Sequence, residues 1–260
     1  MLRRILIIDD HDDLACTLAD ELTGKGHAVS LLRTRDEALA DSDFDNYDLV
    51  ITDLDVTSPQ TDSIAANGSH GKTEHVKAFK IGASNFRCED LDENELKELI
   101  QTILDHKTRY VDKIDAVKNL RENIEFEVPS VIGIMHALLE YLMKRVEKLG
   151  IVTPQQSNLF VALDEAFVNA VKHGNKFDTS KLVRITADVS PAEARFTIED
   201  EGEGFDVNSI PDPLDPQNLF KASGRGVLFI YNIMDEVKYN ERGNRLTMVK
   251  RSDQLNLREA

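Results

Sequence analysis

The sequence contains few cysteines, few basic residues and no long apolar run, and each shortage excludes a class of protein. Its two cysteines, Cys16 and Cys88, lie far apart and form no CxxC pair, which excludes a disulfide scaffold and a cysteine zinc site. Lys and Arg number 31 against 47 Asp and Glu, a formal net charge of −16, whereas nucleic acid and anionic lipid are bound by basic surfaces. No apolar segment approaches the roughly 18 residues of a membrane-spanning helix, and MLRRILIIDD at the N-terminus is no secretory signal. We therefore expect a cytoplasmic protein with neither a nucleic-acid nor a membrane partner.

The pattern of apolar residues predicts two different fold classes along the 260 residues. In the first part, short apolar strands alternate with helices, which predicts a doubly wound parallel α/β sheet. In the last part, helices precede alternating strands, which predicts an α+β sandwich with a mixed or antiparallel sheet covered by helices. The strands expected are 4–8, 28–32, 48–54, 84–87, 124–128, 182–189, 193–200, 236–240 and 245–251. The helices expected are 12–24, 37–41, 73–81, 130–149 (capped by Ser130), 153–173 (opened by Thr153-Pro154) and 224–234.

The two parts are joined by residues 92–122, which no Pro or Gly interrupts. Leu96, Ile100 and Ile103 begin a series of apolar residues at helical spacing that continues with Tyr110, Ile114 and Val117. Two interpretations remain open: a terminal helix followed by a loop and a second helix, or one continuous coiled coil that forms a homodimer. Lys107 at a seam position counts against the coiled coil. The expected division is a first domain at 1–109, a helical connector at 110–123 and a second domain at 124–260.

Acidic residues stand at the ends of two predicted strands of the first part. Asp9 and Asp10 follow the first strand, and Asp53 ends the third. The carboxyl ends of parallel strands form the ligand crevice of such a sheet. Carboxylates gathered there repel one another unless a cation joins them, and oxygen ligands suit Mg²⁺. The alternative is that these acids form ordinary turns.

The segments "ILIIDDHDD", "YDLVITDLDV" and "FKIGASNF" resemble the receiver domain of response regulators over residues 3–105. The resemblance implies that Asp53 is the phosphoacceptor for an upstream histidine kinase and that Asp9, Asp10 and Asp53 hold Mg²⁺. The pattern is degenerate, because the family's Lys-Pro pair is replaced by Arg87-Cys88 and no hydroxyl residue can be assigned to the fourth strand.

The second part carries a stripe of polar residues and two glycine pairs. Glu165, Asn169 and His173 are spaced to share one face of a helix. A stripe of this kind is often only the solvated side of an amphipathic helix. The glycines allow close approach of backbone to a ligand, and a pair before a helix start can cradle phosphate with N–H groups. These pairs are Gly202 and Gly204, after Asp200, and Gly224 and Gly226, on either side of Arg225.

Taken in order, "DEAFVNAVKHGN", "IEDEGEGFD" and "PDPLDPQNLFKASGRGVLFIYNIMDEVKY" resemble the Bergerat-type ATPases, and most of all the anti-sigma-factor serine kinases. The resemblance covers residues 124–251 and implies ATP and Mg²⁺ as ligands. It implies that Asn169 coordinates the metal, that Asp200 accepts from the adenine amine, and that Glu165 is the general base. It further implies that Gly202 and Gly204 shape the adenine pocket, that 206–223 form a lid, and that Gly224, Arg225 and Gly226 contact the phosphates.

Three functions follow from these resemblances. The first is a serine/threonine kinase that phosphorylates a STAS-domain anti-anti-sigma protein, has a sigma factor as a further partner, and is regulated through its receiver domain. The second is a non-catalytic ATP-binding partner switch, which would not need the base Glu165. The third is a histidine kinase, for which His106 and His136 are the candidate phosphoacceptors.

Overall fold

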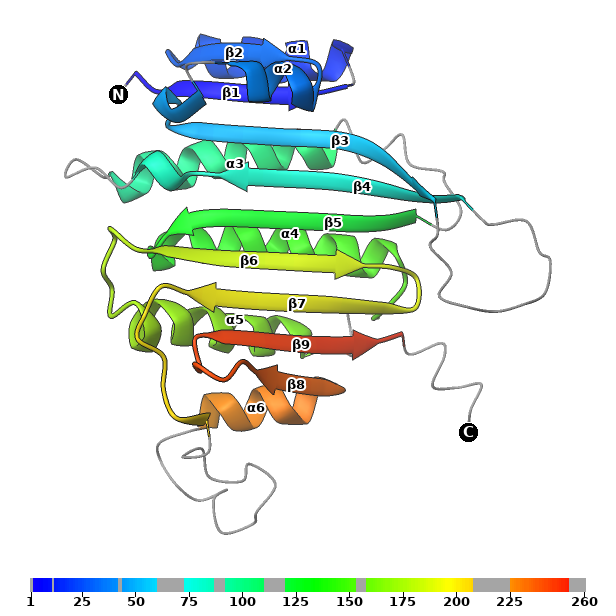
Figure 1. Cartoon of the computed structure of the whole chain (residues 1–260), viewed down its shortest axis with the longest axis vertical. Coiled ribbons are helices and arrows are strands. Elements are labelled where there is room, and N and C mark those ends of the chain that lie inside the picture. The colour runs from blue at the N-terminus through cyan, green and yellow to red at the C-terminus, as the bar shows by residue number, and fades with distance from the viewer. Residues whose placement is uncertain are drawn as a thin grey trace.

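A computed structural model describes residues 2–10, 12–41, 44–59, 73–86, 92–109, 120–152, 158–207 and 225–252. In these residues the strands form one sheet, in the spatial order β2-β1-β3-β4-β5-β6-β7-β9-β8 (Figure 1). The strands are β1 (Arg4–Asp9), β2 (Ala28–Leu32), β3 (Leu49–Pro59), β4 (Thr73–Gly82), β5 (Leu120–Pro129), β6 (Leu182–Val189), β7 (Glu193–Asp200), β8 (Glu236–Tyr239) and β9 (Arg245–Arg251). The α-helices are α1 (Asp12–Gly24), α2 (Arg35–Ala40), α3 (Glu93–Arg109), α4 (Met135–Lys148), α5 (Leu159–Asn169) and α6 (Arg225–Ile233). Single turns are η1 (Phe44–Asn46), η2 (Ser84–Phe86), η4 (Ile132–Ile134) and the π-helical η5 (Ala170–Gly174).

The sheet is mixed, and its strands change direction in the middle. β1 pairs in parallel with β2 and β3, whereas β4 is antiparallel to β3 and parallel to β5. Every pair from β5 to β8 is antiparallel. The pairing of β4 with β5 therefore joins the N-terminal and C-terminal parts in one continuous layer.

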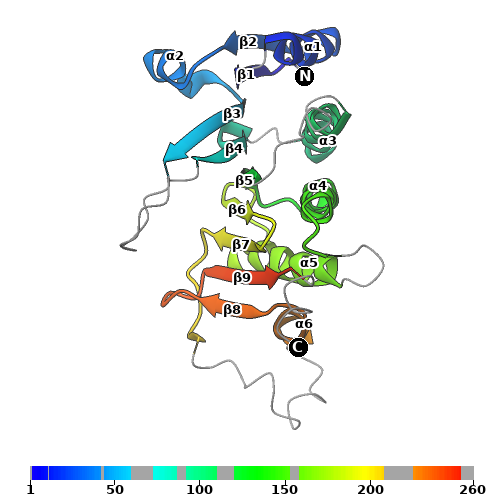
Figure 2. The same cartoon turned by 90° about the vertical axis from the view of Figure 1, so that its right-hand side faces the viewer.

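Helices cover the two faces of this layer unequally. Figure 2 shows α1, α3, α4, α5 and α6 on one face and α2 on the other, beside the N-terminal strands. Buried and partly exposed residues alternate along β6 and β7, which is the pattern of a sheet with one solvated face. Cross-strand ion pairs lie among the partly exposed residues, with Lys80 bonded to Glu125 at 2.8 Å and Arg184 to Glu127 at 2.6 Å.

One apolar core extends through both parts of the chain. Its cluster of buried residues begins at Ile5 and ends at Met248. At the junction, Phe79 of β4 packs edge-to-face on Phe126 of β5, with ring centroids 6.3 Å apart, and both rings contact Tyr141 of α4. Aromatic pairs of this kind add about 0.5–1.5 kcal/mol beyond area burial. The packing thus stabilises the junction of the two parts directly.

The structure corrects two expected elements of the N-terminal part. Residues 73–81, expected to be helical, belong to β4, and Ser84–Phe86, expected to be a strand, form η2. In β4 burial follows a period of two, because Phe79 and Ile81 are buried and Lys80 is not. Neighbours on both sides pair with the β4 backbone, and this tertiary pairing overrides local preference. The antiparallel β4 also means that the predicted doubly wound parallel sheet ends at β3.

The expected long helix over 92–122 is wrong at its C-terminal end. α3 ends at Arg109, and residues 120–123 are strand in β5; residues 110–119 lie outside the described part. Leu96, Ile100 and Ile103, the seam of the expected coiled coil, are buried in the core of the same chain. The apolar spacing therefore reflects packing of α3 on its own sheet, and the homodimer stays a prediction.

The α+β arrangement expected for the C-terminal part is confirmed, with α4, α5 and α6 over a mixed sheet (Figure 1). Ser130 does not cap the first of these helices: its hydroxyl donates to the Lys181 carbonyl at 3.1 Å, and η4 precedes α4. Residues 153–157, the expected start of the next helix, lie outside the described residues, and α5 begins at Leu159. None of the helices in the described ranges is long and apolar enough to cross a membrane.

Candidate nucleotide-binding site

Helix α5 presents Glu165 and Asn169 on its polar side. Its buried side consists of Leu159, Ala162, Leu163, Ala166 and Phe167, which pack into the core. Asn169 is the last residue of α5, and the helix then widens into η5. Asn169 and His173 both line a pocket of ≈ 290 Å³. The structure therefore brings these two residues of the polar stripe to one cavity.

Asp200 ends β7 and faces the same pocket. Its side chain is buried, and its Oδ1 accepts a hydrogen bond from the Gly202 N–H at 2.8 Å. Burial raises the pKa of Asp200 above 3.8, although the Gly202 hydrogen bond and the nearby Arg242 oppose the shift. A buried carboxylate to which few protein groups donate hydrogen bonds is suited to accept one from a ligand amine.

Glycines allow the end of α5 and the end of β7 to touch. A Cβ on Gly174 would lie 2.3 Å from Cγ of Asp200, and a Cβ on Gly202 would lie 2.2 Å from the Gly174 carbonyl oxygen. Gly204 has φ +78°, and a Cβ there would lie 1.9 Å from the Arg242 carbonyl oxygen. Side chains at these positions would separate the elements that form the pocket. That Gly202 and Gly204 shape an adenine pocket stays a prediction.

Two buried asparagines hold the backbone around Asp200, and the sequence analysis missed them. Asn244 donates from Nδ2 to the Asp200 carbonyl at 2.7 Å, and its own carbonyl accepts from the Asp200 N–H at 3.0 Å. Asn175 is fully buried; its Oδ1 accepts from the Glu201 N–H at 2.9 Å, and its Nδ2 donates to the Leu182 carbonyl at 2.8 Å. Asn175 is the last residue of the segment DEAFVNAVKHGN, but no spacing in the sequence points to the contacts of either asparagine.

The start of α6 lies against Glu165. A Cβ on Gly226 would lie 2.2 Å from Glu165 Oε2 and 3.0 Å from its Cδ. The carboxylate is therefore in contact with the first turn of α6, where N–H groups and the helix dipole favour anions. Gly224 lies outside the described residues, as does the expected lid beyond residue 207, and α6 begins at Arg225.

An aromatic pair forms one wall of the pocket. Phe205 and Tyr239 pack edge-to-face with ring centroids 5.3 Å apart, and both line the cavity with Ile198 and Leu246. Burial raises the pKa of Tyr239 to about 12. A cavity with apolar walls and a few polar side chains, among them one buried carboxylate, has the general character of a small-molecule site.

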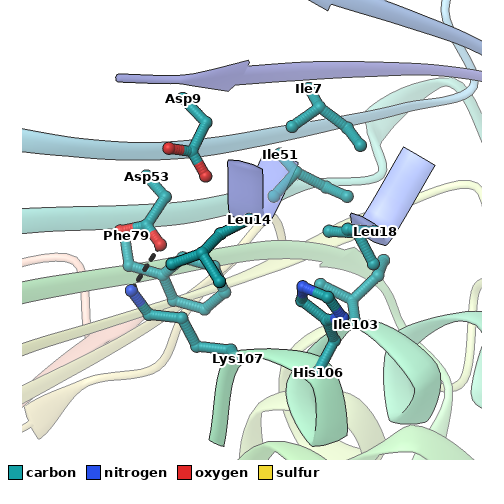
Figure 3. Close-up of a pocket in the computed structure, with 10 residues that line it drawn as sticks. All are labelled: Ile7, Asp9, Leu14, Leu18, Ile51, Asp53, Phe79, Ile103, His106 and Lys107. Atoms are coloured by element: carbon teal, nitrogen blue, oxygen red, sulfur yellow. Dashed lines mark hydrogen bonds and ion pairs between the residues drawn. The ribbon is translucent and has the colours of Figure 1, made fainter. Parts of the chain in front are cut away.

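The N-terminal acidic residues form a different arrangement from the one predicted. Asp9 and Asp53 are neighbours in the register of β1 and β3, and both are buried. Asp10 is exposed, and no group of three acidic, His or Cys side chains suited to a metal occurs among the described residues. Instead Lys107 of α3 bonds to Asp53 at 2.5 Å (Figure 3). The expected Mg²⁺ site of Asp9, Asp10 and Asp53 therefore stays a prediction, and Arg87, which stands where the family has its lysine, lies outside the described residues.

Comparison with known proteins bears on the C-terminal part. Residues 131–250 match the family described as the histidine kinase-like ATPase domain. The serine-protein kinase RsbW of Staphylococcus epidermidis is 31% identical over 98 residues, which cover 35% of this chain and 62% of the relative. RsbW of Bacillus subtilis is 28% identical over 144 residues (52% and 88%), and RsbW of Oceanobacillus iheyensis 27% over 137 residues (49% and 85%). The C-terminal part is thus similar in sequence to histidine kinase-like ATPase domains and to serine-protein kinases.

Proposed function

We propose that the chain is an ATP-dependent serine/threonine protein kinase of the anti-sigma-factor type, and that its substrate is a STAS-domain anti-anti-sigma protein. The proposal is supported by the match of residues 131–250 to the histidine kinase-like ATPase domain and by the similarity to proteins named serine-protein kinase. A sigma factor is proposed as its further binding partner.

One observation carries the proposal: the Glu165 carboxylate contacts Gly226 at the start of α6, beside a pocket lined by Asn169 and Asp200. A carboxylate at this position does not help to bind a nucleotide, because it would repel the negative phosphates that approach there. It is suited to accept a proton from a hydroxyl group that attacks the terminal phosphate.

The residues divide between binding and chemistry. Asp200 accepts a hydrogen bond from the adenine amine, and Gly202 and Gly204, which follow it, allow the close backbone contacts beside the pocket. The N–H groups at the start of α6 bind phosphate oxygens. Glu165 accepts the proton of the substrate's serine or threonine hydroxyl. As the proton leaves, the hydroxyl oxygen bonds to the γ-phosphorus and ADP departs.

Magnesium fits the donors available on α5. The Asn169 side-chain oxygen is a hard ligand of the kind Mg²⁺ accepts, it lines the pocket, and the phosphates and water would supply the remaining ligands. Mg²⁺ bound there would neutralise charge on the transferring phosphoryl group. Most of the catalysis then comes from positioning and charge neutralisation.

The histidine-kinase alternative is poorly supported by the geometry. His106 is 3% exposed, and burial lowers its pKa, so it is enclosed where a phosphoryl donor has no access. His136 is exposed, but it lies on α4, whose apolar face packs in the core of the same chain.

The proposed function is tested by incubating the full chain with Mg-ATP and STAS proteins encoded nearby, then searching for phosphoserine and phosphothreonine by mass spectrometry. We expect transfer by the wild type, and ATP binding without transfer by Glu165→Gln. Asp164→Asn, which also replaces a carboxylate by its amide one residue earlier on α5, is the matched control and should transfer phosphate normally. Transfer by Glu165→Gln at the wild-type rate would refute the base assignment, and ATP binding without any transfer by the wild type would favour the non-catalytic switch.

A further inference from the structure

Two carboxylates occupy adjacent positions inside the N-terminal part. Asp9 and Asp53 are register partners on the parallel strands β1 and β3, and they are 7% and 5% exposed. Asp9 and Asp53 line a small cavity, and Ile7 and Ile51, two residues earlier on the same strands, line it as well. Buried carboxylates this close raise each other's energy, and the arrangement needs a compensating positive charge.

Lys107 supplies that charge from the last turn of α3. Its side chain is 6% exposed, and its Nζ lies 2.5 Å from Asp53 Oδ2. The same nitrogen lies 5.0 Å from the centroid of the Phe79 ring, within the range of a cation–π contact. Figure 3 shows the lysine extending from α3 to Asp53, which is placed beside Asp9. Burying an ammonium is costly unless it is paired, and Asp53 pairs this one.

The space around the pair has no room for a hydrated divalent cation. The cavity measures ≈ 20 Å³ and is lined mainly by apolar side chains, among them Leu14, Leu18 and Ile103. That volume is about one water molecule, whereas Mg²⁺ in proteins usually keeps several waters. With Lys107 bonded to Asp53 and so little space beside the pair, the described residues do not fit the magnesium ion that the receiver resemblance implies.

We propose that the Lys107 ammonium is the resident cation of the Asp9–Asp53 pair, so that the site excludes a divalent metal and fastens the end of α3 to the sheet. This lysine latch, formed by Asp9, Asp53 and Lys107, replaces a phosphorylation site. α3 also packs on η4 and α4, so the latch holds the N-terminal strands and the start of the ATPase-like part in a fixed relation. The latch joins residues 54 positions apart in sequence.

The first test uses the wild-type full chain without nucleotide, labelled at isoleucine methyl groups and titrated with Mn²⁺. Ile7 and Ile51 line the cavity, and Ile185 of β6 is the remote reference. We expect the signals of Ile7 and Ile51 to keep their intensity relative to Ile185 into the millimolar range of Mn²⁺. Selective loss of these two signals at lower concentration would show a metal at the carboxylates and overturn the proposal.

The second test is a double-mutant cycle of urea unfolding with Asp53→Asn, Lys107→Met and the double variant. We expect both single variants to lower the unfolding midpoint and the double variant to lose less than the two losses combined. Lys97→Met, an exposed lysine on the same helix, is the matched control and should shift the midpoint little. Additive losses would show that the two charges do not interact and would overturn the latch. Neither test involves nucleotide, so their outcome is separate from that of the kinase proposal.

Discussion

Replacing Gly226 by alanine should displace the Glu165 carboxylate without lowering the stability of the fold. The new Cβ would lie 2.2 Å from Glu165 Oε2, and the carboxylate must retreat by about 1 Å to reach van der Waals distance. Oε2 is the end of a flexible side chain, so it can rotate away while the backbone stays in place. Gly226 has no positive φ, and alanine is the better helix former by about 1 kcal/mol.

The expected effect on catalysis is large compared with the effect on folding. A misplacement of about 1 Å in a catalytic group costs about 100-fold in rate, which corresponds to roughly 2.7 kcal/mol in the activation barrier. We therefore expect kcat for phosphoryl transfer to fall about 100-fold in Gly226→Ala. ATP affinity should stay within a few fold, because alanine retains the N–H group at the start of α6.

The assay is single-turnover transfer from Mg-ATP to the STAS substrate, accompanied by urea unfolding and equilibrium ATP binding. Gly24→Ala is the matched control, since a Cβ there meets nothing within 4 Å. Gly202→Ala is the contrasting variant: its Cβ would also lie 2.2 Å from an oxygen, but that atom is the Gly174 backbone carbonyl. We expect Gly202→Ala to lose about 1–3 kcal/mol of stability, as overpacking against a rigid neighbour does.

Two results would refute this reasoning. If Gly226→Ala transferred phosphate at the wild-type rate, Glu165 would not be the base or would not depend on its contact with α6. If Gly226→Ala unfolded as readily as Gly202→Ala, the flexible carboxylate would not be the group that absorbs the clash.

Three further predictions concern charge and ionisation. Arg145 and Glu122 are 2% and 3% exposed and are bonded at 2.6 Å, so Arg145→Met leaves Glu122 as a buried, unpaired carboxylate. Urea unfolding should show that the free energy of unfolding falls by about 3–5 kcal/mol. A loss below 1 kcal/mol would contradict burial of the pair. Because burial raises the pKa of Asp200, this carboxylate, which we propose accepts a hydrogen bond from adenine, protonates at a higher pH than an ordinary aspartate. ATP affinity should therefore fall on acidification more in the wild type than in Asp200→Asn, and parallel pH profiles in calorimetry would count against the assignment. Tyr239 ionises near pH 12 when folded and near 10.0 when unfolded. Its contribution is present below pH 10.0 and is lost as the pH rises towards 12, by about 2–3 kcal/mol, and Tyr239→Phe should remove this part of the alkaline decline in urea unfolding.

Motifs in the C-terminal part could be found from sequence because they depend on short spacings. Glu165 and Asn169 are four residues apart and share a helix face wherever the helix forms. The strands 182–189 and 193–200 alternate between apolar and polar residues over most of their length, and the structure has them at the same bounds. Asn175 and Asn244 could not be identified in this way, because their partners lie on other elements and an isolated asparagine has no distinctive spacing.

The N-terminal part was harder to predict for a related reason. Residues 73–82 have no strong local preference, and they form a strand because β3 and β5 lie on either side to pair with it. The helical spacing of 92–109 was correctly identified, but the same pattern fits a dimer seam and a helix packed on its own sheet. Lys107 illustrates the ambiguity, since it appeared to be a misplaced seam residue and is the partner of a buried carboxylate.

The sequence by itself determined the local elements of the C-terminal part and the net negative charge, because these depend on periodicity and composition. The candidate residues of the proposed nucleotide pocket came from the resemblance of its motifs to a known family. Only the tertiary structure decided that β4 joins β5 in one sheet, that Glu165 meets the start of α6, and that Lys107 neutralises Asp53. These features are contacts between residues far apart in the chain, and their energies depend on burial and distance, which the order of residues alone does not specify.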